Sequence, residues 1–142
     1  MIRFDALTSA AYSGSGTGQM ILAPSLSEGL AAVAPLSPTR TFIIGGATLY
    51  AQVLPLPSVD RILLTRVLDP AFEDCDVFLP EFRDGEKSQE GPLDNKDGSS
   101  ARWRQATHAD LVKWVDFDVP SGIQEEKGVK YEFQMWVKDL AS

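Results

Sequence analysis

The sequence is poor in the side chains that most often carry metal or covalent chemistry. Among its 142 residues it has one cysteine, Cys75, and one histidine, His108. A single cysteine cannot form a disulfide within the chain, and the two residues together supply too few ligands for a usual zinc site. We therefore predict no metal centre. The scarcity of histidine also argues against most arrangements of a Ser-His-Asp triad.

Basic residues are also few, since 13 lysine and arginine side chains stand against 20 aspartate and glutamate side chains and leave a net charge of −7. This balance argues against binding to nucleic acid or to an anionic membrane, because both attract basic patches. No apolar run reaches the roughly 18 residues of a membrane span, and Asp5 comes too early for a signal peptide. We expect a cytoplasmic protein with one domain, residues 1–142, because a hydrophobic content of 44% suits a single core.

The pattern of apolar residues predicts a succession of strands and helices. Ser25 precedes Glu28 by three residues, as in a capping box, and begins a helix that should end near residue 34. A second helix covers residues 47–54 and is stopped by Pro55. Strands are expected where apolar residues run together or alternate, at residues 3–9, 19–23, 41–44, 61–68, 77–80, 112–119 and 129–137.

Two of these strands and one further segment have distinctive compositions. Residues 41–44 form a continuous apolar run, which is typical of a strand buried on both faces. Residues 129–137 alternate between apolar and polar side chains after a turn at Lys127 and Gly128. Residues 81–101 consist mainly of aspartate, glutamate, lysine, glycine and serine, so we expect a solvated loop insertion there.

Gly45 and Gly46 stand between the strand expected at residues 41–44 and the helix expected at residues 47–54. A glycine pair lets a ligand approach the backbone because no Cβ is in the way. The helix N-terminus offers free N–H groups and a positive dipole end, which suit a diphosphate, and Thr48 adds a hydroxyl. The pattern alone favours equally a tight turn that binds no ligand.

Residues 43–50, which contain this glycine pair, resemble the cofactor-diphosphate turn of dihydrofolate reductases. Three further stretches resemble segments of that family in the same order. They are the next core strand at residues 61–67, an acidic-then-aromatic segment at residues 72–80 and the C-terminal hairpin at residues 124–133. Four ordered motifs carry more weight than one glycine pair. The resemblance spans residues 41–138, and the long charged loop is similar to that of fungal members.

The resemblance implies an α/β fold of the dihydrofolate-reductase type, with a mixed, mostly parallel sheet, flanking helices and a C-terminal antiparallel hairpin. It also implies a small-molecule pocket with NADPH as the cofactor. The residues that would line the cofactor diphosphate are Gly45, Gly46, Ala47 and Thr48. The residues that would face the substrate are Ile44, through its carbonyl, Tyr50 and Thr65, the last two being candidate catalytic hydroxyls. The alternative for Tyr50 is a packed helix aromatic, and for Thr65 an ordinary strand residue.

The N-terminal part departs from the family pattern. Residues 3–9 can be aligned with a family strand that ends in a hydroxyl residue followed by an arginine that holds the 2′-phosphate of NADPH. Ser9 keeps the hydroxyl, but Ala10 replaces the arginine, which argues against selectivity for NADPH. We also expect the chain to lack the family's first strand and the helix that carries its catalytic acid. Because that carboxylate organises proton delivery to the pteridine, we expect no folate reduction by this chain unaided.

Three hypotheses for function follow. The first is a repurposed small-molecule pocket, such as that of a non-redox enzyme that catalyses isomerisation, elimination or cyclisation of a hydrophobic metabolite. The second is an NADPH-dependent dihydrofolate reductase, and the third is a non-catalytic binding or scaffold protein. Since an incomplete fold exposes strand edges and apolar surface, we expect a homodimer, or a complex with a protein that covers the missing N-terminal region.

Overall fold

The structure of this chain is a computed structural model, and the residues that it describes are 2–3, 21–83 and 102–139. Their contacts divide the chain into an N-terminal unit, residues 1–44, and a C-terminal unit, residues 45–142. The single domain expected from the composition stays a prediction. The expectations for Ser9, for Ala10 and for residues 84–101 lie outside the described residues.

The N-terminal unit begins with a short parallel strand pair and continues into a capped helix. Its elements are β1 (Ile2–Arg3), β2 (Ile21–Leu22), α1 (Leu26–Val33) and the 3-10 turn η1 (Ala34–Leu36). The Ser25 hydroxyl accepts a hydrogen bond from the backbone N–H of Glu28 at 3.3 Å. This contact satisfies one of the N–H groups that a helix start leaves unpaired. The predicted start of this helix is therefore confirmed.

Residues 41–44 do not form the buried strand that their apolar run predicts. Their backbone has no regular secondary structure, and the side chains of Phe42 and Ile44 are 56% and 71% exposed. A strand buried on both faces needs a neighbouring strand to pair with its backbone. No strand among the described residues pairs with this segment. The run has the composition of an interior strand without the pairing that would make it one.

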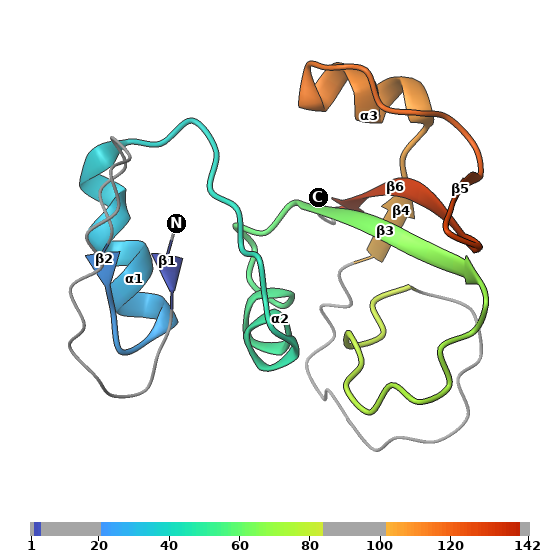
Figure 1. Cartoon of the computed structure of the whole chain (residues 1–142). Coiled ribbons are helices and arrows are strands. Elements are labelled where there is room, and N and C mark those ends of the chain that lie inside the picture. The colour runs from blue at the N-terminus through green and yellow to red at the C-terminus, as the bar shows by residue number, and fades with distance from the viewer. Residues whose placement is uncertain (1, 4–20, 84–101, 140–142) are drawn as a thin grey trace, which may run out of the picture. The chain divides into compact units, whose positions relative to one another are not determined.

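The C-terminal unit is a sheet with helices beside it (Figure 1). Its elements are α2 (Ala47–Val53), β3 (Arg61–Asp69), β4 (Arg102–Gln105), α3 (His108–Val115), β5 (Gln124–Glu126) and β6 (Val129–Asp139). The helix predicted at residues 47–54 and the strand predicted at residues 61–68 are both confirmed to within one residue at their ends. The turn at Lys127 and Gly128, with φ of 51° and 81°, joins β5 to β6 as the sequence predicts.

All pairing in this sheet is antiparallel, so the prediction of a mostly parallel sheet is wrong for the described residues. The strand order is β3-β6-β4, and β5 pairs with β6 as well. β3 pairs along one edge of β6, and β4 and β5 share the other edge. A parallel sheet needs crossover connections between neighbouring strands. Here β3, β4 and β5 each run against the same long strand, and only β1 and β2 pair in parallel in the described chain.

β6 is covered on both faces. Successive side chains of a strand point to opposite faces, and Leu111 of α3 packs on the face that carries Met135, each being 4% or less exposed. On the other face the Phe82 ring meets Trp136 edge-on with 5.4 Å between ring centroids. The polar half of the β6 alternation therefore does not face water throughout, and Lys138 is only 5% exposed.

Residues 112–119, which the sequence predicts as a strand, form the second half of α3 and the chain that follows it. A capping box decides this. The Thr107 side chain accepts from the backbone N–H of Asp110, and the Asp110 carboxylate accepts from the backbone N–H and hydroxyl of Thr107. With its start fixed, the apolar residues of this segment lie on one side of a helix.

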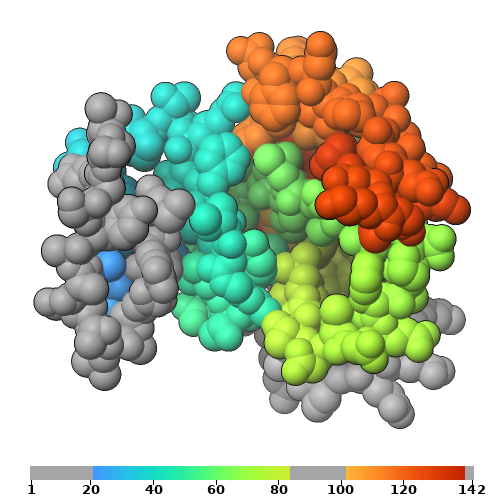
Figure 2. Space-filling model, in the orientation of Figure 1, coloured from blue at the N-terminus to red at the C-terminus, as the bar shows by residue number. Residues whose placement is uncertain are grey.

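Residues 77–80, also predicted as a strand, have no regular secondary structure. They belong to an extended segment, residues 70–83, whose yellow-green atoms lie on the outside of the C-terminal unit in Figure 2. Val77 and Phe78 are 68% and 71% exposed, so the apolar composition of this segment does not reflect burial. At its end, Phe82 turns inward and packs edge-on against Trp103, with 6.0 Å between ring centroids.

The capping box of α3 predicts a pH dependence of helix stability. The hydrogen bonds from Thr107 lower the pKa of Asp110 below its ordinary value of 3.8. A carboxyl whose folded pKa is depressed stabilises the folded state above its unfolded pKa, and this stabilisation is lost as the pH falls through the folded pKa. The protection factors of the α3 amides against hydrogen exchange should therefore fall below about pH 4. Asp110→Asn should remove this acid sensitivity. Asp116→Asn is the control and should keep it, because it leaves the capping box intact and asparagine also tolerates the left-handed φ of 65° at that position.

Candidate functional site

The glycine pair forms a sharp turn ahead of α2. Gly45 has a φ of 112°, which side chains with a Cβ rarely adopt, and the peptide bond between Gly45 and Gly46 is cis. A Cβ built on Gly45 would lie 3.2 Å from Tyr50 Oη, so the tyrosine ring fills the space beside this glycine. The Gly46 carbonyl accepts hydrogen bonds from the backbone N–H groups of Leu49 and Tyr50 at 2.9 and 3.0 Å, which ties the turn to the helix.

The two glycines differ in what surrounds them. A Cβ built on Gly46 would meet no atom within 4 Å, and Gly46 is exposed. Thr48 is also exposed, and Ala47 between them is half-buried. The turn therefore presents open backbone and a hydroxyl on its outer side and a packed tyrosine on its inner side. Ile44, which the resemblance assigns to the substrate, lies in the other unit.

Thr65 occupies a different environment. It lies in β3, opposite Phe133 of β6, and it lines an apolar cavity of about 230 Å³. Side chains of β3, of β6, of α3 and of the chain that follows α3 form its walls: Leu63, Leu64, Leu111, Val115, Phe117, Val119, Pro120 and Phe133. Three polar residues, Thr65, Asp118 and Gln134, complete the lining. Sequence reasoning singled out Thr65 but gave no signal for Asp118, which reaches the cavity because α3 turns the chain back over the sheet.

A second cavity, of about 140 Å³, lies where β4 passes into α3. It is lined by polar groups that include Gln105, Thr107 and Glu132. His108 also lines it, and His108 Nε2 lies 2.8 Å from the carbonyl oxygen of Val119. The histidine thus joins the start of α3 to the chain that follows the helix. That contact is a structural role for the only histidine of the sequence.

Lys138 is a residue that sequence reasoning missed. Its ammonium group donates hydrogen bonds to the carbonyl oxygens of Leu54 and Leu56, both at 2.8 Å, and lies 5.2 Å from the centroid of the Trp103 ring. Burial lowers the pKa of this lysine. The lysine thus donates to the carbonyl of Leu54, which caps the end of α2, and to that of Leu56 just beyond it, and it thereby fastens the end of the helix to the sheet. The polar side of an alternating strand gave no sign that one lysine on it would be buried.

The structure therefore brings some of the expected site residues together and separates others. The glycine turn leads into α2, which carries Tyr50 and whose C-terminal end is fastened on the sheet face of Lys138. Thr65 is on the opposite face by the alternation of β3 and β6, under α3. The roles of the turn residues, of Ile44, of Tyr50 and of Thr65 stay predictions.

Comparison with known proteins decides the family. The sequence model of a family described as dihydrofolate reductase matches residues 7–106. The chain belongs to the dihydrofolate reductase family. Among its relatives, the dihydrofolate reductase of Pneumocystis carinii is 41% identical over 102 residues, which are 71% of this chain and 43% of the relative. That of Cryptococcus neoformans is 40% identical over 117 residues, covering 69% of this chain and 46% of the relative.

The predicted resemblance of this chain to fungal dihydrofolate reductases is thus confirmed. The similarity extends to animals, since the dihydrofolate reductase of Sus scrofa is 32% identical over 102 residues, covering 69% of this chain and 39% of that protein. The chain spans less than half the length of each of these relatives. Among the described residues, no group of three or more histidine, cysteine, aspartate or glutamate side chains is placed to hold a metal ion. No described helix is both long and apolar enough to cross a membrane.

Proposed function

We propose that this chain acts in an NADPH-dependent dihydrofolate reductase, to which it contributes the cofactor-diphosphate turn and part of the central sheet. Membership of the dihydrofolate reductase family, together with the open turn at Gly45 and Gly46, carries the proposal. The fungal relatives that share about 40% of their aligned residues with the chain are named dihydrofolate reductases. These relatives favour the reductase over the non-redox enzyme, which was the first hypothesis from the sequence. No observation supports the non-redox enzyme.

The turn residues fit the diphosphate of a dinucleotide. Gly46 has no side chain and no neighbour within 4 Å on that side, so an anionic group can reach its backbone. The exposed Thr48 hydroxyl can donate a hydrogen bond to a phosphate oxygen, and such charge-assisted bonds are stronger than neutral ones. Tyr50 supports the turn from the opposite side, where its hydroxyl lies beside Gly45. When bound, the cofactor supplies the hydride.

The described residues are better suited to binding than to proton transfer. Thr65 and Tyr50 carry hydroxyls, which can orient a substrate through hydrogen bonds. Asp118 shares a cavity with Thr65 on the sheet face that α3 covers. We therefore assign cofactor binding and substrate orientation to this chain. Because the chain spans less than half of each relative above, we expect the purified chain to bind NADPH without oxidising it at an enzymatic rate.

A fluorescence titration of NADPH with Thr48 variants tests this assignment. Thr48→Val keeps the shape of the side chain and removes the hydroxyl, so it should raise the dissociation constant by about tenfold, the effect of losing one charge-assisted hydrogen bond of about 1.5 kcal/mol. Thr48→Ser keeps the hydroxyl and should bind within about twofold of the wild type. Failure of the wild-type chain to bind NADPH, or equal affinity of the Val and Ser variants, contradicts the proposal. Dihydrofolate-dependent oxidation of NADPH, measured on the same sample, separates binding from turnover.

A further inference from the structure

α2 is a short helix that follows directly on the glycine turn. It has seven residues, Ala47–Val53, and a helix of this length is not stable in isolation. Gly46 gives its N-terminal end no side-chain cap, and its seven residues include no basic side chain that could complement the dipole at its C-terminal end. The position of the glycine turn therefore depends on contacts that other parts of the chain make with α2.

Two prolines follow α2 and limit how its C-terminal end can be capped. A helix end commonly receives backbone N–H groups from the residues just beyond the C-cap, which is Leu54 here. Pro55 and Pro57 have no N–H group to donate. The carbonyls that precede these prolines, those of Leu54 and Leu56, both accept from the Lys138 ammonium at 2.8 Å. A lysine from the sheet thus takes the place of a local cap.

A series of hydrogen bonds connects this lysine to the glycine turn. The Leu54 carbonyl accepts from Lys138 Nζ, and the Leu54 N–H donates to the Tyr50 carbonyl at 3.0 Å. The Tyr50 N–H donates in turn to the Gly46 carbonyl, also at 3.0 Å. The Tyr50 hydroxyl lies beside Gly45, where a Cβ would come within 3.2 Å of it. Loosening the C-terminal end of α2 therefore also loosens the residue that supports the turn.

Lys138 has a fixed position from which to hold the helix. It lies on β6 opposite Trp103 of β4, and the residue before it pairs with Arg61 of β3. Its backbone N–H donates to the Asp60 carbonyl at 2.9 Å, and its ammonium lies 5.2 Å from the centroid of the Trp103 ring. A strand with partners on both sides is among the last parts of a domain to open locally. The lysine therefore connects a mobile short helix to a rigid strand.

We propose that Lys138 is a positioning residue for the cofactor, because its ammonium holds α2 in the orientation in which the glycine turn binds the NADPH diphosphate. The inference rests on the cofactor role proposed above for that turn. Lys138 lies at the opposite end of α2 from the turn, so it acts through Leu54 and Tyr50. Without the ammonium, α2 frays from its C-terminal end. NADPH then loses affinity in proportion to the fraction of time for which the turn is formed.

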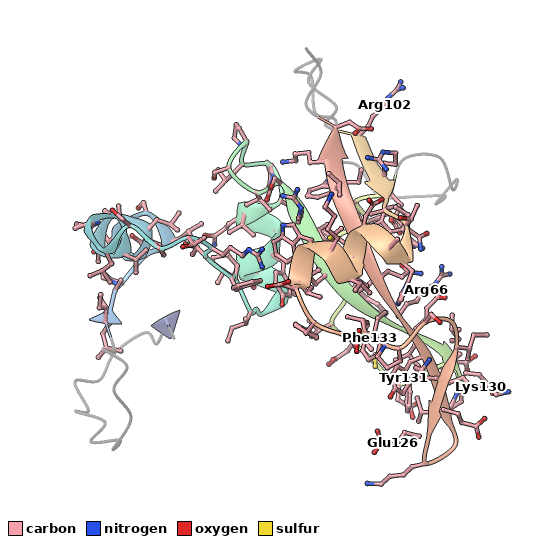
Figure 3. The ribbon with its side chains drawn as sticks, turned by 90° about the horizontal axis from the view of Figure 1, so that it is seen from above. Arg66, Arg102, Glu126, Lys130, Tyr131 and Phe133 are labelled. Atoms are coloured by element: carbon pink, nitrogen blue, oxygen red, sulfur yellow. The ribbon has the colours of Figure 1, made fainter. Side chains whose placement is uncertain are left out.

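NADPH titrations of three variants, at a temperature where circular dichroism shows all of them folded, test this role. Lys138→Met should raise the dissociation constant about tenfold, as for a turn that is formed about a tenth of the time. Lys130→Met removes the same charge at the hairpin end of β6, away from α2 (Figure 3), and should bind within about twofold of the wild type. Thr107→Ala removes the cap of α3 and lowers stability away from α2, and it should also bind within about twofold.

Amide hydrogen exchange without NADPH separates the positioning role from the proposed function. In Lys138→Met the amides of Tyr50 and Leu54 should lose more protection than that of Leu111 in α3, and Thr107→Ala should show the reverse order. Equal losses in both helices of Lys138→Met contradict the role.

The titrations distinguish two failures. A wild-type chain that does not bind NADPH overturns the proposed function and this inference with it. If the wild type binds NADPH and Lys138→Met binds it no more weakly than Thr107→Ala or Lys130→Met does, the proposed function stands and the positioning role is wrong.

Discussion

Replacing Lys138 by methionine should destabilise the C-terminal unit by about 2 kcal/mol. The substitution keeps the aliphatic stem beside Trp103 and removes the ammonium that donates to the carbonyls of Leu54 and Leu56. Hydrogen bonds from a charged donor contribute about 1.5–3 kcal/mol each. Part of that loss is offset, because the variant no longer buries a charge. For a unit of this size, the net loss lowers the melting temperature by roughly 10 °C.

Lys130→Met is the matched control for this prediction. Lys130 lies on the same strand, is exposed, and has a long ion pair to Asp69 with 3.7 Å between Nζ and the carboxylate. Exposed ion pairs contribute about 0–1 kcal/mol, so this variant should melt within a few degrees of the wild type. Thermal unfolding followed by circular dichroism compares the two. Equal losses for both variants would mean that Lys138 does not fasten α2.

The same lysine gives a signed dependence on pH. Burial lowers the pKa of Lys138 in the folded state, so at alkaline pH the unfolded chain binds more protons at this residue than the folded chain. Stability rises with pH wherever the unfolded state binds more protons. The stability of the wild type relative to Lys138→Met should therefore increase as the pH rises from the lowered folded pKa towards the ordinary lysine pKa.

Gly45→Ala should cost about 1–3 kcal/mol of stability and weaken NADPH binding together. The φ of 112° at this position is sparsely populated by residues with a Cβ, and holding one there stores strain of that size. The added methyl would also lie 3.2 Å from Tyr50 Oη, so the ring must move. Adding Tyr50→Phe removes the crowded hydroxyl and should restore part of the loss. A melting temperature equal to that of the wild type would show that the turn does not require its left-handed conformation.

Gly46→Ala separates ligand binding from stability in the same turn. Its φ of −87° is open to alanine, and a methyl there meets no protein atom within 4 Å. The melting temperature should therefore stay within a few degrees of the wild type. If the diphosphate lies against this backbone, the methyl occupies its path, and the dissociation constant for NADPH should rise about tenfold or more. Unchanged affinity in this variant would place the cofactor elsewhere.

Local signals in the sequence predicted much of the structure. Ser25 at a helix start, Lys127 and Gly128 at a hairpin and the alternation of β6 each act through hydrogen bonds or packing within a few residues of themselves. The Thr107 capping box is equally local, but the apolar residues at 112–119 also have the composition of a strand, and the strand predicted from them is wrong. The family was also predictable, because motifs in fixed order carry it even where single elements are assigned wrongly.

The failures share a dependence on distant partners. The apolar run at residues 41–44 has strand composition, yet a strand exists only where a neighbour pairs with it. The direction of the sheet was inferred from the whole family fold, whereas the described strands pair only with β6. Burial of Lys138 depends on the carbonyls of Leu54 and Leu56, more than 80 residues earlier in the chain. Composition near a residue cannot predict such contacts.

The position of β6 in the chain bears on how the protein is made. β3, β4 and β5 pair with β6 and not with one another, and all three precede it in the sequence. During synthesis on the ribosome they emerge before the strand that organises them. The sheet of this unit must therefore form after β6 leaves the exit tunnel, and until then the apolar residues of β3 lack the strand that pairs with them.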